Sequence, residues 1–238
     1  MNMLDWSRID LVVFDVDGTL YDQQRLRRAM LLRLLVDAAR SRSLQELRVL
    51  RVFRQVREAL GDAGDPDFLT AQYARSAQQL GCAPEQVQAL ATDWMERRPL
   101  PLLSACRLPQ VERLFDGLRR AGKTVAVFSD YPAADKLKAL GLQAHPVVCA
   151  GDPQCTRLKP DPAGLLAILK STGVTPGRAV LIGDRFDRDA AAAQRAGTHA
   201  LIRSRRRHPQ VPTFRRYDDP VFHPVLAPPG ERLAESMP

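Results

Sequence analysis

Two kinds of hydrophobic pattern divide the chain. Short runs of aliphatic and β-branched residues predict strands at residues 11–14, 124–128, 146–149, 179–182 and 198–202. Segments with helical spacing separate the later strands and predict helices at residues 111–121, 133–140, 162–171 and 189–196. The first run, Leu11-Val12-Val13-Phe14, has no polar position, which is typical of a strand buried on both faces of a parallel sheet. We therefore predict an α/β fold with a doubly wound parallel sheet.

Residues 21–108 follow a helical period throughout. Apolar residues between Leu26 and Leu35 form one stripe, and Ser43 and Glu46 have the spacing of a capping box at the start of a second helix. Two further helices are expected at residues 67–80 and 84–97. Interruptions are expected at residues 61–66, Pro99, Pro101 and Pro109. This segment is therefore predicted to form a separate all-helical unit.

The predicted organisation has three parts. Residues 1–20 and 109–204 form a Rossmann-like core, and residues 21–108 form an all-helical domain inserted after the first strand. Residues 205–238 contain an arginine triplet, seven prolines and no periodicity. We expect this tail to be extended, either disordered or laid over the surface. Truncation after Ser204 is therefore expected to preserve activity.

The net charge of +8 is concentrated in two segments. Residues 25–57 carry +8 and residues 203–216 carry +6, so the rest of the chain sums to −6. Phe53 is the one aromatic residue within the first segment, whereas nucleic-acid platforms interleave basic and aromatic residues. Nucleic acid is therefore not the expected partner. Arginines at positions 25, 27, 28 and 33 form either a solvated helix face or a site for an anionic substrate beneath the helical insert.

The sequence also bears on cellular location. No apolar run approaches the roughly 20 residues that a membrane-spanning helix needs. The first ten residues carry two acids and no apolar core of a secretory signal. Four cysteines without CxxC spacing do not suggest a disulfide framework or a zinc site. A cytoplasmic protein without membrane contact is expected.

Polar residues follow three of the predicted strands. Asp15 and Asp17 come directly after the first strand, Ser129 follows the second, and Asp184 and Asp189 follow the strand at residues 179–182. The carboxyl ends of parallel strands meet at one edge of a sheet, where ligands bind in open α/β folds. A lysine at position 159 follows the intervening strand and can reach the same edge. These groups are therefore predicted to converge.

Four carboxylates at one edge repel one another by several kcal/mol. A divalent cation relieves this repulsion, and Mg²⁺ prefers hard oxygen ligands together with water and a substrate phosphate. Lys159 adds a fixed positive charge, and Ser129 can hydrogen-bond to a phosphate oxygen. The sequence thus predicts a Mg²⁺ site that receives a phosphoryl group.

Four segments resemble the motifs of the haloacid dehalogenase (HAD) superfamily, in the order that superfamily shows. They are Asp15-Val-Asp17-Gly-Thr-Leu, Ser129, Lys159-Pro-Asp and Gly183-Asp184 through Asp189. The helical insert resembles the small C1-type cap of that superfamily, in a phosphoglycolate-phosphatase-like build. The resemblance covers about residues 9 to 204.

The resemblance implies specific roles. Asp15 would be the nucleophile that forms an aspartyl-phosphate, and Asp17 would act as general acid and then general base. Lys159 would neutralise charge on Asp15 and the phosphate. The implied substrate-binding residues are Ser129, Thr19 and Gly18. The implied Mg²⁺ ligands and supporting groups are Asp15, Asp17 through its main-chain carbonyl, Asp184 and Asp189.

The sequence departs from common members at two places. Asp130 follows Ser129 where Asn is frequent, and four residues instead of three separate Asp184 from Asp189. Asp187 competes with Asp189 for the role of supporting the metal. Asp189 is favoured because it begins the alanine-rich helix at the usual distance from Gly197, but the sequence does not settle the choice.

The resemblance implies a Mg²⁺-dependent phosphatase that acts on a small phosphorylated metabolite. A phosphosugar mutase of the same superfamily and a non-catalytic interaction module with the same fold are the alternatives. Carbon–halogen cleavage is disfavoured because it requires neither Mg²⁺ nor an acid at the position of Asp17. Either a monomer or a homodimer is compatible with the sequence.

Overall fold

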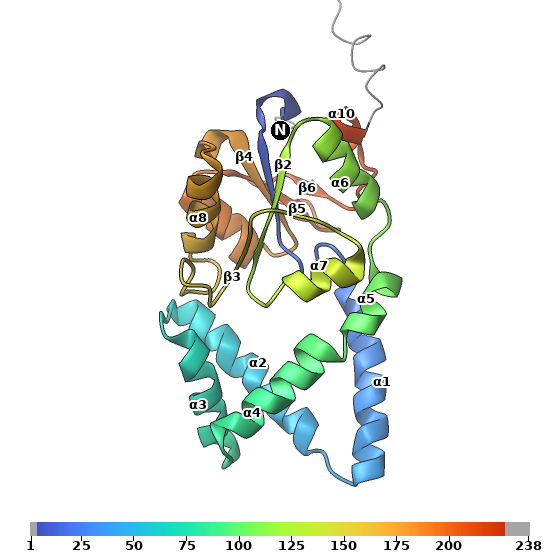
Figure 1. Cartoon of the computed structure of the whole chain (residues 1–238), viewed down its shortest axis with the longest axis vertical. Helices are drawn as coiled ribbons and strands as arrows, with labels where there is room; N and C mark the ends of the chain where they lie inside the picture. The colour runs from blue at the N-terminus through green and yellow to red at the C-terminus, as the bar shows by residue number, and fades with distance from the viewer. Residues whose placement is uncertain (1–3, 227–238) are drawn as a thin grey trace, which may run out of the picture.

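A computed structural model describes residues 4–226. Its core is a six-stranded sheet in the order β3-β2-β1-β4-β5-β6, and every neighbouring pair is parallel (Figure 1). The strands are β1 (Leu11–Phe14), β2 (Thr124–Ser129), β3 (Val147–Cys149), β4 (Ala179–Gly183), β5 (His199–Arg203) and β6 (Thr213–Phe214). The central strand β1 lies between β2 and β4 and is fully buried, which explains its continuous apolar run.

Helices cover both faces of this sheet, so the prediction of a doubly wound α/β fold is confirmed. The core helices are α6 (Val111–Arg120), α7 (Ala134–Leu140), α8 (Ala163–Thr172), α9 (Ala191–Ala196) and the short α10 (His223–Leu226). Val12 and Phe14 of β1 pack with residues of α6, α7 and α10. Leu11 and Val13 pack with residues of α8 and α9 on the opposite face. This division follows the alternation of side chains along a strand.

The segment between β1 and α6 is helical and lies beyond the carboxyl ends of the strands, below the sheet in Figure 1. Its helices are α1 (Gln23–Ser41), α2 (Gln45–Ala63), α3 (Phe68–Leu80), α4 (Pro84–Ala91) with a π-helical continuation over Thr92–Arg97, and α5 (Leu100–Cys106). Val49 and Phe53 of α2 form a small core with residues of α3 and α4. These helices therefore bury apolar surface among themselves.

Three local expectations for this segment were wrong. Pro99 lies between two helices as expected, but Pro101 lies in the first turn of α5 instead of interrupting it, because the first helical turn needs no N–H donor from that position. Gly61 lies inside α2, which ends at Ala63 with Gly64 as its C-cap. The Ser43 hydroxyl accepts a hydrogen bond from the N–H of Gln45 at 3.2 Å, one residue earlier than a capping box requires.

The expectation of a disordered or surface-laid tail was also wrong for residues 205–226. Thr213–Phe214 forms edge strand β6 beside β5. Phe214, Tyr217 and Phe222 are at most 3% exposed and belong to the core cluster on the α6 face. These aromatic residues have no periodic spacing because each is buried by a turn or a short element, so the sequence pattern did not reveal them. Residues 227–238 of the predicted tail lie outside the described part of the chain.

Two expectations that concern the cellular environment can be compared with the structure. All four cysteines are free thiols. Within residues 4–226, no helix combines the length and the apolar character that crossing a bilayer requires.

Candidate active site

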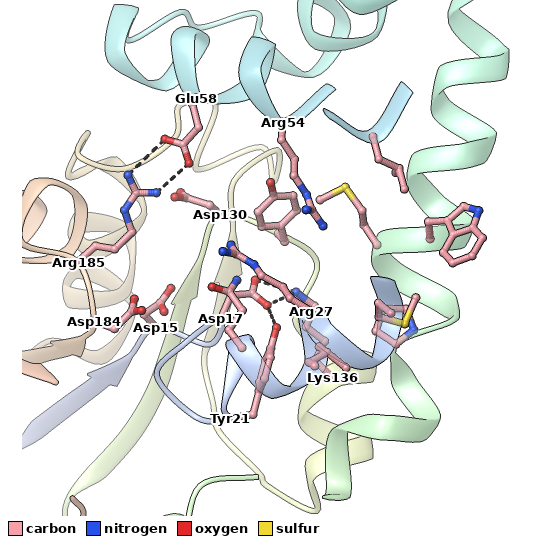
Figure 2. A pocket seen from close by; sticks show the side chains of 18 of the residues that line it. Asp15, Asp17, Tyr21, Arg27, Arg54, Glu58, Asp130, Lys136, Asp184 and Arg185 are labelled. Carbon is pink, nitrogen blue, oxygen red and sulfur yellow. Dashed lines mark hydrogen bonds and ion pairs between the residues drawn. The ribbon is translucent and has the colours of Figure 1, made fainter. Parts of the chain in front are cut away.

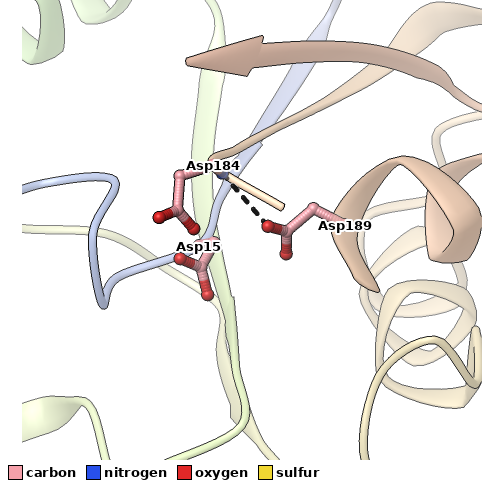
Figure 3. A group of neighbouring side chains, drawn as sticks. All are labelled: Asp15, Asp184 and Asp189. Atoms are coloured by element: carbon pink, nitrogen blue, oxygen red, sulfur yellow. Dashed lines mark hydrogen bonds between the residues drawn. The ribbon is translucent and has the colours of Figure 1, made fainter. Parts of the chain in front are cut away.

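Three aspartates converge at the carboxyl ends of two central strands. Asp15 follows β1, Asp184 follows β4, and Asp189 lies in the π-helical turn Phe186–Ala190. One carboxylate oxygen from each lies within 4.8 Å of the others (Figure 3). Asp189 is also fixed internally, because its Oδ2 accepts hydrogen bonds from the N–H groups of Asp184 and Arg185 at 3.1 and 3.0 Å. The two strands thus bring together residues that are far apart in sequence.

Two glycines allow this convergence. Gly18 has a φ of +90°, and a Cβ there would lie 2.2 Å from Oδ2 of Asp184. A Cβ on Gly183 would lie 2.3 Å from Cγ of Asp189. A side chain at either position would displace a carboxylate of the cluster, since real Cβ atoms do not approach other heavy atoms so closely.

Lys159 joins two of these carboxylates. Its Nζ donates to Oδ1 of Asp15 at 2.6 Å and to Oδ1 of Asp189 at 2.7 Å, and the side chain is 2% exposed. Burial alone would lower the pKa of Lys159, but Asp15, Asp189 and the neighbouring Asp130 hold it well above its ordinary value. Lys159 is therefore a permanent cation at the site.

One cation does not neutralise this cluster. Burial raises the pKa of Asp15 well above its usual range. Lys159 lowers this pKa, but the negative charges of Asp189 and Asp184 raise it again. Burial and Asp189 raise the pKa of Asp184 to about 6. Carboxylates that are hard to ionise because they are buried together can gain from a hard divalent cation. The donor set fits Mg²⁺.

Asp17 occupies a separate position. Nζ of Lys136 lies 2.7 Å from both carboxylate oxygens of Asp17, and the Tyr21 hydroxyl donates to Oδ1 (Figure 2). Burial would raise the pKa of Asp17, but the Lys136 ion pair and the Tyr21 hydrogen bond bring it below its ordinary value. The carboxylate of Asp17 thus lies with Lys136 and outside the three-aspartate cluster, so a metal contact would involve its main chain.

Sequence reasoning missed Lys136 and Tyr21. Lys136 lies in the first turn of α7, shortly after Ser129, and is 6% exposed. The available signal was a lysine in the helix that follows a motif strand, but two lysines of α7 fit that description. Lys138, two residues later, is exposed, so the sequence alone did not distinguish the two lysines.

The predicted substrate-binding residues take supporting positions. The Thr19 hydroxyl donates to Oδ2 of Asp15 at 2.9 Å, and Thr19 is fully buried. Ser129 is also fully buried, and its Oγ accepts the N–H of Tyr131 at 3.2 Å. Neither of these residues, nor Gly18, is among the residues that line the adjacent cavity. In this structure Thr19 orients Asp15, and Gly18 makes room for Asp184.

The structure places Asp187 and Asp189, the two candidates for supporting the metal, in different environments. Asp187 lies at the surface, with its side chain 66% exposed, and forms an ion pair with Arg185 at 2.7 Å. Asp189 is 1% exposed and lies with Asp15 and Asp184. Asp189 is therefore the residue placed to support a metal.

A cavity of about 500 Å³ lies between the aspartates and the helices α1 and α2 (Figure 2). Its core side includes Asp15, Asp17 and Lys159. Its helical side combines apolar and charged residues, among them Leu26, Met30, Leu34, Leu50, Trp94, Arg27, Arg51, Arg54 and Glu58. This volume suits a small metabolite.

Ion pairs connect α2 to the core beside this cavity. Glu58 accepts hydrogen bonds from Arg185 at 2.8 Å and from Arg188 at 2.9 Å. Arg188 also donates to the main-chain oxygen of Lys159 at 2.7 Å. The Arg57 guanidinium donates to the main-chain oxygen of Asp130. Helix α2 is thus fastened to the loops that carry the catalytic candidates.

Comparison with known proteins places the chain in a family. The family model of haloacid dehalogenase-like hydrolases matches residues 9–197. The chain therefore belongs to this hydrolase family, and the resemblance found in its motifs is confirmed.

Individual relatives extend this result. The chain is 34% identical over 209 residues to a phosphoglycolate phosphatase of Rhodospirillum rubrum, covering 81% of this chain and 78% of that protein. It is 28% identical over 220 residues to a glyceraldehyde 3-phosphate phosphatase of Methanopyrus kandleri, covering 89% and 90%. The structure of the HAD hydrolase YfnB of Bacillus subtilis, bound to magnesium, has a similar fold, with a TM-score of 0.66 at 14% identity and coverage of 92% and 99%.

Proposed function

We propose that this protein is a Mg²⁺-dependent phosphatase that hydrolyses a small phosphomonoester through an aspartyl-phosphate on Asp15. The observation that carries the proposal is the cluster of Asp15, Asp184 and Asp189 within 4.8 Å, facing the cavity. Relatives with phosphatase names support the class of substrate. We further propose that residues 21–108 act as a cap over this cavity.

Asp15 is held in position for attack on phosphorus. Lys159 binds its Oδ1 and Thr19 binds its Oδ2, so the carboxylate cannot rotate freely. In the first step an oxygen of Asp15 forms a bond to phosphorus as the bond between phosphorus and the ester oxygen breaks. In the second step water attacks the phosphorus of the aspartyl-phosphate, which releases inorganic phosphate and restores Asp15.

Asp17 acts as general acid in the first step and as general base in the second. The bound phosphate adds negative charge beside Asp17, which favours its protonated form, and that proton then passes to the leaving alkoxide. The resulting carboxylate accepts a proton from the attacking water. Lys136 stabilises this charged form of Asp17, with its Nζ 2.7 Å from each oxygen.

Asp15, Asp184 and the main-chain carbonyl of Asp17 would hold Mg²⁺, and Asp189 would support them. When bound, the ion supplies positive charge that offsets the charge on the transferring phosphoryl oxygens. Lys159 adds to the same charge balance through its contacts with Asp15 and Asp189.

The replacement Asp15→Asn tests the proposal. We expect release of inorganic phosphate from a panel of small phosphomonoesters to require Mg²⁺, to cease with a chelator and to be abolished in this variant. Asp187→Asn is the matched control, since it removes an exposed carboxylate three residues from the metal candidate Asp184. Near-normal turnover by Asp15→Asn would rule out the covalent route.

The same assays separate the alternatives. Conversion of hexose phosphates into isomers without release of phosphate would indicate a mutase, which uses the same two aspartates. The absence of Mg²⁺-dependent turnover over a broad panel would indicate a non-catalytic interaction module.

A further inference from the structure

Some charged side chains around the cavity are paired with a group of opposite charge, and others are not. On the core side, each lysine and arginine that lines the cavity is paired with a carboxylate. The pairs are Lys136 with Asp17, Lys159 with Asp15 and Asp189, and both Arg185 and Arg188 with Glu58 of α2. On the helical side, Arg27 of α1 and Arg54 of α2 also line the cavity. Within residues 4–226, neither of these two arginines has a hydrogen bond or an ion pair with another side chain.

The two arginines face the same space from different helices. Figure 2 shows the Arg27 side chain reaching into the cavity from α1 and the Arg54 side chain reaching into it from α2. Burial and the neighbouring positive charge of Arg27 lower the pKa of Arg54. Two like charges that face a common space without a carboxylate partner favour an anionic ligand between them.

Neighbouring arginines show that this placement is specific. The sequence left open whether the arginines of α1 form a solvated face or bind an anion. Arg25 and Arg28 are not among the residues that line the cavity, whereas Arg27 is. Arg33 lies near the main-chain oxygen of Arg98 at 3.4 Å. Arg27 therefore differs from the other arginines of α1, none of which lines the cavity.

We propose that Arg27 and Arg54 form a second anion site, and that the substrate is a small phosphomonoester carrying a second anionic group. The scissile phosphate would lie at Asp15, and a carboxylate or a second phosphate would lie between the two guanidinium groups. This inference rests on the proposed phosphatase function and specifies its substrate class.

Three phosphate esters with the same two-carbon skeleton test the site. The probes are 2-phosphoglycolate, which carries a carboxylate, ethane-1,2-diyl bisphosphate, which carries a second phosphate, and ethyl phosphate, which carries neither. With Mg²⁺ present, we expect kcat/KM to be at least about 10-fold higher for one of the probes with a second anionic group than for ethyl phosphate, because ethyl phosphate cannot form the charge-assisted hydrogen bonds to the two arginines. The preferred anionic probe identifies the second group. Equal kcat/KM values for all three esters would overturn the inference.

Arginine variants locate the effect. Arg27→Met and Arg54→Met keep an apolar stem and are each expected to reduce the preference for the anionic probe by about 10-fold, mainly through KM. Arg28→Met, which alters an exposed arginine of the same helix outside the cavity, should leave the preference unchanged. A preference that survives both Arg27→Met and Arg54→Met would place the second anion elsewhere and contradict the assignment.

A binding measurement separates this inference from the proposed function. Calorimetric titration of the Asp15→Asn protein with the same esters reports affinity without turnover. Tighter binding of an anionic probe that weakens in Asp15→Asn/Arg54→Met supports the site even if no ester is hydrolysed. Equal affinity in both proteins would refute it, even if the protein proves to be a phosphatase.

Discussion

Gly18 and Asp184 approach each other so closely that a Cβ on residue 18 would lie 2.2 Å from Oδ2 of Asp184. Gly18 belongs to the turn after β1, and Asp184 follows β4, so this contact joins two adjacent strand ends. The turn therefore sets the position of a carboxylate that would ligate the metal.

Gly18→Ala is expected to impair metal binding more than folding. The new methyl group must displace Asp184, so we expect at least about a 10-fold weaker apparent affinity for Mg²⁺ in the phosphate-release assay, together with backbone strain of about 1–2 kcal/mol at positive φ. Gly122→Ala is the control, because Gly122 also has a positive φ, of +71°, but a Cβ there would have nothing within 4 Å. Equal Mg²⁺ affinities in the two variants would contradict this explanation.

Lys136→Met is expected to shift the pH profile of the enzyme. The ion pair with Lys136 lowers the pKa of Asp17, so its removal should raise that pKa and move the acidic limb of the kcat profile to higher pH. Loss of the buried partner should also lower the free energy of unfolding by about 3–5 kcal/mol. Measurement of kcat against pH and of urea unfolding checks both effects.

Lys138→Met provides the comparison for this variant, because Lys138 is on the same helix and exposed. It should retain the wild-type pH profile. An unchanged profile in Lys136→Met would show that Lys136 stabilises the fold without setting the protonation of Asp17.

Mg²⁺ is expected to stabilise the protein more at neutral than at acidic pH. The pKa of Asp184 is raised to about 6 from 3.8, so between these values the folded metal-free protein binds more protons than the unfolded chain. Its free energy of unfolding should therefore fall as the pH rises through this window. Mg²⁺ binds the ionised carboxylates and should offset that loss at neutral pH.

Thermal unfolding with and without Mg²⁺ at about pH 5 and about pH 7.5 measures this effect. The rise in Tm with Mg²⁺ should be larger at the higher pH. Asp184→Asn should remove most of the difference, since it has no proton to lose. An equal rise in Tm at both pH values would argue against Asp184 as a ligand.

Truncation after Ser204 is now expected to unfold the protein, in contrast to the expectation from sequence. It removes Phe214, Tyr217 and Phe222 from the core, and each buried aromatic side chain contributes about 1.5–3 kcal/mol to a total stability of about 5–15 kcal/mol. A chain ending at Leu226 keeps the described contacts and should fold. Circular dichroism and calorimetry of both truncations check this prediction.

Tyr217→Phe tests the same region with a smaller change. The Tyr217 hydroxyl donates to the main-chain oxygen of Thr19 at 2.8 Å. Loss of this buried hydrogen bond should cost about 1 kcal/mol, or about 2–4 °C in Tm for a protein of this size. A Tm equal to that of the wild-type protein would show that the bond adds no net stability.

The strand pattern and the aspartates at the strand ends were predictable because both depend on local sequence. An apolar run such as residues 11–14 favours a buried strand wherever it occurs, and parallel strands bring their carboxyl ends to one edge. This reasoning was sufficient to place Asp15, Asp184 and Lys159 together, although the sequence could not choose between Asp187 and Asp189.

Contacts between distant segments decided the rest. The partner of Asp17 lies 119 residues away at Lys136, and nothing local distinguishes that lysine from Lys138. The burial of Phe222 and the lack of an ion pair for Arg27 within residues 4–226 likewise depend on which surfaces meet. The sequence determined the strands, the helical insert and the acidic strand ends, because propensity and periodicity act over a few residues. The tertiary structure decided which charges are paired and which face the cavity, because burial and Coulomb interactions depend on distance in space.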